Sequence, residues 1–149
     1  MSYRTVLLDA NVLYPADLRD LLLELAFHRI YRARWTSQIQ DEWINALLRN
    51  EPHRSSQALK RTADMMDQAI SEAVISNYQD VESRLNLPDP DDRHILAAAI
   101  TGQCDTIVTN NLKDFPTDVL AGEGLIAQEP DTFLSDLYGQ HTEVFRKVV

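Results

Sequence analysis

The segment Thr5–Leu8 (TVLL) is a run of β-branched and aliphatic residues, and Asp9 follows it directly. A strand that is apolar on both faces belongs inside a parallel sheet covered by helices on both sides. Further short strand-like stretches alternate with helical ones along the rest of the chain. The sequence therefore predicts an α/β fold, a three-layer α/β/α domain with a mostly parallel central sheet.

The other expected elements follow from apolar periodicity and from capping residues. We find no repeat or linker and treat residues 1–149 as one domain, with about 139–149 as a tail or helix extension. We predict further strands at 30–35, 73–76, 105–111 and 124–128. We predict helices that begin at Pro15 and at about residue 54, helices at 37–50, 78–85 and 129–140, and one that begins at Asp89 and is capped by Gly102.

Composition narrows the class of protein. Hydrophobic residues are 44% and no apolar run reaches the ~20 residues that span a bilayer, so no membrane is expected. The single cysteine cannot form an intrachain disulfide, and the default compartment is a reducing cytoplasm. The formal net charge of −9 argues against a nucleic-acid ligand, unless many of the acids converge on metal ions.

Several acids stand where a ligand would bind in such a fold. Asp9 and the segment 109–115 (TNNLKDF) both follow predicted strands, and ligands of parallel sheets bind beyond the carboxyl ends of the strands. Asp92 shares a helix face with Ile95 and Leu96. Burying an unpaired carboxylate costs several kcal/mol, so a cation must compensate Asp92 or the group must be protonated.

Each remaining acid has a structural alternative. Glu42 lies on the core-facing stripe of its helix but could reach outward to solvent. For Asp89 and Asp91 we favour helix capping and the helix dipole. Asp9 could be a turn residue, and Asp114 could pair with Lys113 or cap the segment that begins at Pro116. The convergence of acids from distant segments on one sheet edge nevertheless favours hard divalent ions, Mg²⁺ or Mn²⁺, and the four histidines show no paired spacing for zinc.

The order of these segments resembles the PIN-domain nucleases, whose bacterial members include VapC-type toxins of toxin–antitoxin pairs. The resemblance rests on "LLDANVL", the acid in "TSQIQDEW", "DPDDRHILAAAI" and "IVTNNLKDF", and "GLIAQEPDTFLSDL" resembles the closing strand and helix of the family. It covers nearly the whole chain. It implies a PIN-like fold, metal-dependent hydrolysis of RNA phosphodiesters, and an antitoxin and a homodimer as expected partners.

The resemblance also implies roles for individual residues. Asp9, Glu42 and Asp92 match the three principal metal-binding acids of the family. Asn111 stands where a further acid or Asn is usual, with Asp114 close behind, so that catalysis would use Asp9, Glu42, Asp92 and Asp114. Because Asn111 adds no charge, the site could hold either one or two metal ions, and their number remains open. Asn11 and Thr109 match positions that support the acid pocket.

Positive surface for RNA is expected in "HRIYRARW", where Arg29, Arg32 and Arg34 alternate with Tyr31 and Trp35. The alternative is that the arginines lie on the solvent-facing side of an edge strand and that the aromatic residues belong to the core. Two other functions stay open. One is a phosphotransferase of the haloacid-dehalogenase type, although Asn11 replaces its general acid. The other is a catalytically silent RNA-binding or scaffold domain.

Overall fold

A parallel sheet forms the centre of the computed structural model, which describes residues 3–148; Met1, Ser2 and Val149 of the predicted domain lie outside the described residues. Its strands are β1 (Thr5–Leu8), β2 (Arg32–Arg34), β3 (Thr106–Val108) and β4 (Ile126–Gln128), in the order β2-β1-β3-β4. Leu7 pairs with Arg34 on one side and with Ile107 on the other, and every strand pair is parallel. Strand β1 therefore lies inside the sheet, with a parallel neighbour on each side.

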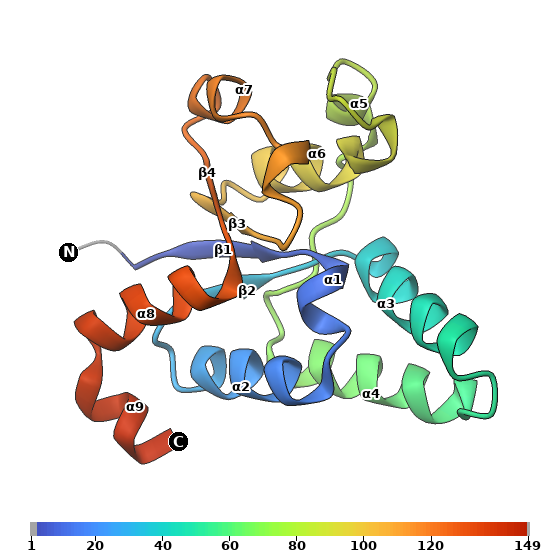
Figure 1. Ribbon diagram of the computed structural model, residues 1–149, viewed down its shortest axis with the longest axis vertical. Helices are drawn as coiled ribbons and strands as arrows, with labels where there is room; N and C mark the ends of the chain where they lie inside the picture. The colour runs from blue at the N-terminus through green and yellow to red at the C-terminus, as the bar shows by residue number, and fades with distance from the viewer. Residues whose placement is uncertain (1–2, 149) are drawn as a thin grey trace.

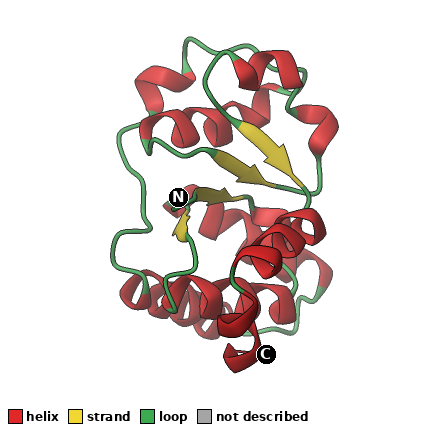
Figure 2. Cartoon of the chain, turned by 90° about the vertical axis from the view of Figure 1, so that its left-hand side faces the viewer, coloured by secondary structure: helices red, strands yellow, loops and turns green. Residues whose placement is uncertain are grey.

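Helices cover both faces of this sheet, which confirms the predicted three-layer architecture (Figures 1 and 2). One face carries α5, α6 and α7, and the other carries α2 and α4, while α1 and α3 stand beyond the carboxyl ends of β1 and β2. The helices are α1 (Ala10–Leu13), α2 (Ala16–Phe27), α3 (Ser37–Asn50), α4 (Ser56–Ala69), α5 (Gln79–Glu82), α6 (Arg93–Thr101), α7 (Thr117–Ala121), α8 (Pro130–Gln140) and α9 (Thr142–Val148).

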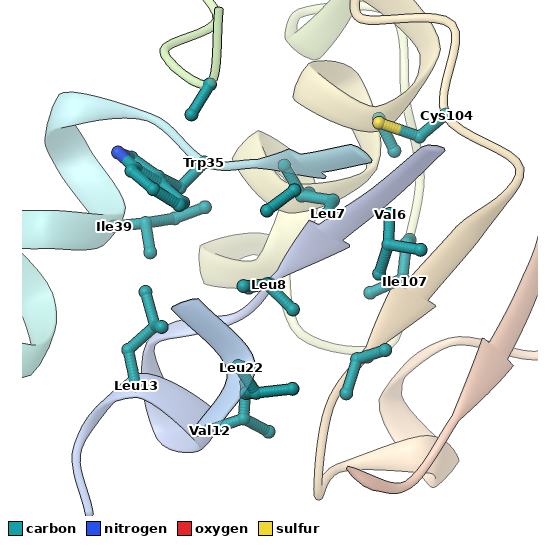
Figure 3. Close-up of a cluster of buried hydrophobic side chains, with 14 of the residues drawn as sticks. Val6, Leu7, Leu8, Val12, Leu13, Leu22, Trp35, Ile39, Cys104 and Ile107 are labelled. Carbon is teal, nitrogen blue, oxygen red and sulfur yellow. The ribbon is translucent and has the colours of Figure 1, made fainter. Parts of the chain in front are cut away.

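The core lies on both sides of β1, as Figure 3 shows. Val6, Leu7 and Leu8 are fully buried, as the apolar run predicted. Ala97, Ala98 and Ala99 of α6 are also fully buried, and α6 packs directly against β1. Small side chains allow a helix to lie close to the sheet that it covers. The start of α6 is thereby held near the end of β1.

Some expected elements differ from the observed ones. The predicted strand 73–76 is wrong, because only Val74 forms a bridge, to Trp35, among the described residues of this segment. The residues after Asp9, expected to turn, instead form the short helix α1. Asp89 caps a 3₁₀ turn, η1 (Pro90–Asp92), before α6 begins, and Gly102 ends that helix as predicted. The tail forms a separate helix, α9, whose Phe145 packs edge-on against Tyr138.

The aromatic residues of "HRIYRARW" belong to the core, as the second interpretation of that segment expected for the aromatic residues. Tyr31 and Trp35 are fully buried. The Tyr31 hydroxyl donates to the carbonyl of Leu22 at 2.7 Å, and Trp35 Nε1 donates to Asp67 Oδ1 at 2.7 Å. Neither ring is available for stacking on a base. None of the helices in residues 3–148 has the length and apolar character needed to cross a membrane.

Replacement of Tyr31 by phenylalanine tests this assignment. Tyr31→Phe removes the buried hydroxyl that donates to the Leu22 carbonyl, so we expect the free energy of unfolding to fall by about 1 kcal/mol. Urea denaturation followed by fluorescence measures the change, with the exposed Tyr138→Phe as the matched control. Equal unfolding midpoints for wild type and Tyr31→Phe would contradict the assignment.

Candidate active site at the carboxyl edge of the sheet

Asp9 and Thr109 follow the neighbouring strands β1 and β3 and meet at the carboxyl edge of the sheet. Leu8 pairs with Val108, so the next residue of each strand lies beside the other. Thr109 Oγ1 donates to Asp9 Oδ2 at 2.8 Å, and the backbone N–H of Ala10 donates to Asp9 Oδ1 at 2.7 Å. Both Asp9 and Thr109 are buried. Burial raises the pKa of Asp9 above its ordinary value, and these two hydrogen bonds oppose that rise.

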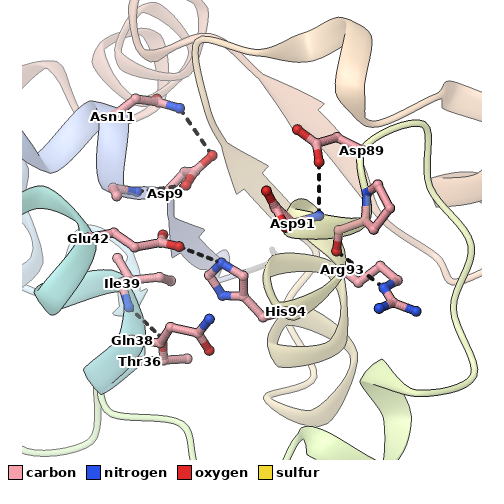
Figure 4. A network of polar contacts seen from close by, with 12 residues as sticks. Asp9, Asn11, Thr36, Gln38, Ile39, Glu42, Asp89, Asp91, Arg93 and His94 are labelled. Carbon is pink, nitrogen blue, oxygen red and sulfur yellow. Dashed lines mark hydrogen bonds and ion pairs between the residues drawn. The ribbon is translucent and has the colours of Figure 1, made fainter. Parts of the chain in front are cut away.

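Asn11 connects the same carboxylate to the loop after β3, as Figure 4 shows in part. Its Nδ2 lies 3.1 Å from Asp9 Oδ2 and 3.2 Å from Thr109 Oγ1, while its Oδ1 accepts from the backbone N–H of Asn110. Thr109 Oγ1 also accepts from the backbone N–H of Asn111. The structure thus brings Asn11 and Thr109 together around Asp9, in the arrangement expected for supporting residues.

Helix α3 carries Glu42 to this edge. Thr36 caps the helix by accepting from the backbone N–H of Ile39. Gln40 is buried and donates to the carbonyl of Ala63 and to Asp67 of α4. These bonds fix α3 against α4. Glu42, two residues after Gln40, lies on the other side of α3. The contacts of Gln40 with α4 therefore fix the helix that carries Glu42.

A histidine that the sequence did not single out contacts Glu42. His94 of α6 is 3% exposed, and its Nε2 lies 2.9 Å from Glu42 Oε2 (Figure 4). Burial alone would lower the pKa of His94, but the hydrogen bond and charge of Glu42, together with Asp9, raise it above its ordinary value. The sequence feature that could have identified His94 is its place among the apolar residues of α6, two residues after Asp92. The spacing of the histidines alone did not indicate its contact with Glu42.

Asp92 is the least compensated acid of the cluster. It ends η1, and its Oδ2 is buried without a hydrogen-bond partner in the structure. Burial, followed by the charges of Asp114, Asp9 and Asp89, raises the pKa of Asp92 from 3.8 to about 7. The prediction that the Asp92 carboxylate needs a cation or a proton is thus consistent with its surroundings.

The loop after β3 contributes the remaining predicted acid. Asp114 ends the 3₁₀ turn η2 (Leu112–Asp114), is half-buried, and is close enough to Asp92 to raise its pKa. Asn111 caps η2 through its backbone and is exposed. Asp91 is exposed, and Asp89 Oδ1 accepts from the backbone N–H of Asp91 at 2.9 Å. The capping interpretation of Asp89 is therefore confirmed.

The three arginines of "HRIYRARW" do not join this cluster. Arg29 and Arg32 are exposed and lie at or before the start of β2, where Arg32 pairs with Thr5 at the amino end of β1. Arg34 is half-buried and donates to the carbonyls of Ala73 and Gly102. Since Asp9 follows the carboxyl end of β1, Arg29 and Arg32 belong to the opposite edge of the sheet. Their role in RNA binding stays a prediction.

The donor chemistry of the cluster suits a hard divalent cation. Four carboxylates, those of Asp9, Glu42, Asp92 and Asp114, gather at one edge, and an oxygen of Asp92 has no partner. Oxygen-only ligands favour Mg²⁺ or Mn²⁺. Within residues 3–148, however, no group of three or more acidic, histidine or cysteine side chains is placed so that it could hold a metal ion. The donor atoms, which are carboxylate oxygens with one of them unpartnered, fit such an ion in their chemistry.

Asp92 should make the stability of the metal-free protein depend on pH. Between about pH 4 and pH 7 the folded state retains a proton on Asp92 that the unfolded state has lost, so the free energy of unfolding falls as the pH rises. Asp92→Asn should reduce this slope and be more stable than wild type above pH 7. Urea denaturation in EDTA measures the slope, and Asp91→Asn, one residue away and exposed, is the control. An unchanged slope in Asp92→Asn would contradict the shift.

Comparison with known proteins places the chain in a family. A family model described as "PIN domain" matches residues 5–113, a range that includes Asp9, Glu42 and Asp92. A Mycobacterium tuberculosis (strain ATCC 25618 / H37Rv) protein named "Putative ribonuclease VapC50" is 36% identical over 80 residues, 54% of this chain and 47% of that protein. The chain spans about half the length of this curated relative. Since the family match covers most of the chain and the fold agrees with it, the chain belongs to the PIN domain family.

Proposed function

We propose that this protein is a metal-dependent endoribonuclease that hydrolyses RNA phosphodiesters at the acidic edge of its sheet. The observation that carries the proposal is the buried, unpartnered Oδ2 of Asp92, which faces the charges of Asp114 and Asp9. Such a group must either carry a proton or be compensated by a cation, and a bound cation would allow it to remain ionised above pH 7. The name of the mycobacterial relative supports RNA as the substrate.

Asp9, Glu42 and Asp92, with Asn111 and Asp114, would hold Mg²⁺ or Mn²⁺. Bound there, such ions can activate a water molecule and stabilise the leaving oxygen of the phosphodiester. The protein would contribute fixed positions, because Asp9 is held by Thr109, Asn11 and the backbone of Ala10. Its carboxylates alone would repel an anionic substrate, so RNA binding at this edge would require the cation.

A toxin of a toxin–antitoxin pair is the biological role that we propose for this activity. The antitoxin would be a separate protein with a basic or amphipathic segment that covers the acidic edge, since the formal net charge of −9 favours a basic partner. Homodimerisation is proposed on the family resemblance. We propose the cytoplasm as the compartment, because a chain with a single cysteine has no intrachain disulfide that would require an oxidising environment.

The family match favours hydrolysis over the haloacid-dehalogenase alternative, in which Asp9 would become phosphorylated. A catalytically silent scaffold on the same fold is the competing proposal. It differs in one measurable property, because a scaffold without the metal site has no reason to be stabilised by Mg²⁺ or Mn²⁺.

Metal binding is tested by thermal unfolding. We expect Mn²⁺ or Mg²⁺ to raise the Tm of wild type, since an ion that binds only the folded state stabilises it. Asp92→Ala should lose most of this rise, while the exposed neighbour Asp91→Ala should retain it. Equal Tm values for wild type with Mn²⁺ and with EDTA would favour the scaffold.

Catalysis is tested by cleavage of a mixed RNA pool. Asp9→Asn keeps the shape of the side chain but removes its charge, so we expect cleavage to fall to the level of wild type in EDTA while the circular dichroism spectrum is unchanged. Asp41→Asn, on the exposed side of α3, should cleave as wild type does. Undiminished cleavage by Asp9→Asn would refute the catalytic assignment.

A further inference from the structure

The contact between His94 and Glu42 differs from the other polar contacts of the acidic edge. His94 projects from α6 toward α3, as Figure 4 shows, and its ring is almost completely buried. Nε2 lies 2.9 Å from Glu42 Oε2, whereas Nδ1 is buried without a hydrogen-bond partner in the structure. A carboxylate oxygen can only accept, so Nε2 is the nitrogen that donates in this contact.

Glu42 depends on this contact more than Asp9 depends on any of its own. Its side chain is 40% exposed and has several rotatable bonds. Among the residues that the structure describes, its carboxylate makes no other hydrogen bond or ion pair. Asp9, by contrast, accepts from Thr109, Asn11 and a backbone N–H. Without His94, the Glu42 carboxylate would be free to turn toward solvent.

We propose that His94 is a positioning residue for the metal site: by donating to Oε2 of Glu42 it holds that carboxylate in the position in which it would ligate the ion. The inference rests on the proposed function, in which Glu42 is a metal ligand. Hydrogen bonds from residues behind a ligand commonly fix its orientation, and their loss typically costs roughly 10- to 100-fold in metal affinity.

The position of His94 in α6 strengthens this assignment. Asp92 immediately precedes α6, and His94 is the second residue of that helix. The same short segment therefore provides a predicted ligand and the residue that holds another one. Because α6 packs on β1, which ends at Asp9, the segment also fixes the distance between these groups and Asp9.

Metal affinity separates a positioning role from a purely structural one. Isothermal titration calorimetry with MnCl₂ should show binding to His94→Leu that is roughly 10- to 100-fold weaker than to wild type. His94→Gln can place an amide N–H near the position of Nε2 and should restore most of the affinity. His94→Asn carries its amide too close to the backbone to reach Glu42 and should bind Mn²⁺ as weakly as His94→Leu does. The Gln and Asn variants provide a matched comparison if leucine prevents folding.

A double-mutant cycle asks whether His94 acts through Glu42. In the background of Glu42→Gln, the further change His94→Leu should have little effect on Mn²⁺ affinity. His28→Leu removes a surface histidine that lies 3.3 Å from Glu24, and it should bind Mn²⁺ as wild type does. Urea denaturation of each variant in EDTA measures the loss of stability separately from the loss of affinity.

The outcomes distinguish this inference from the proposed function. Binding of Mn²⁺ to wild type, together with unchanged affinity in His94→Leu or equal affinities in His94→Gln and His94→Asn, overturns the positioning role and leaves the nuclease proposal intact. Absence of Mn²⁺ binding to wild type overturns the proposed function and this inference with it. Weak binding by His94→Leu and by His94→Asn, restored by glutamine, supports the positioning role.

Discussion

The hydrogen bond from Thr109 to Asp9 is the interaction around which the acidic edge is organised. It joins residues one hundred positions apart, and it exists because β1 and β3 are parallel neighbours that end at the same level. The order β2-β1-β3-β4 places the following connections on opposite sides of this point, which is where parallel sheets open a crevice for ligands. A carboxylate buried there without donors would cost several kcal/mol. The donors that surround Asp9 make its position tolerable.

The surroundings of Asp92, unlike those of Asp9, do not provide a hydrogen-bond donor to each carboxylate oxygen. Its Oδ2 lacks a partner, and nearby acids raise its pKa to about 7. Proteins place such costly groups mainly where a ligand or a reaction requires them. Asp9 has hydrogen-bond donors on both of its oxygens, whereas Asp92 Oδ2 has none, and this contrast supports the proposal that a cation binds at Asp92.

The sequence predicted those features that depend on local pattern. Apolar runs and capping residues located the strands β1 and β3 and the helices α3 and α6, and the helical face of Asp92 indicated its conflict with burial. It did not predict the role of His94, because the contact with Glu42 joins two helices about fifty residues apart, and such a pairing leaves no trace in spacing. Helix α1 was missed because a helix of four residues is too short to show a period. In "HRIYRARW" the alternation was identified correctly, but which side faces the core depends on the layers packed around β2.

The three buried alanines of α6 have a consequence for how this edge could change over evolution. They are fully buried in a helix that packs on both β1 and α5, so a bulkier residue at the positions that face the sheet would push the helix away from it. Both the acid that precedes the helix and the imidazole in its first turn would be displaced together. Activity could therefore be lost through a substitution that touches no polar atom, and regained only by a compensating reduction in volume on the facing strand.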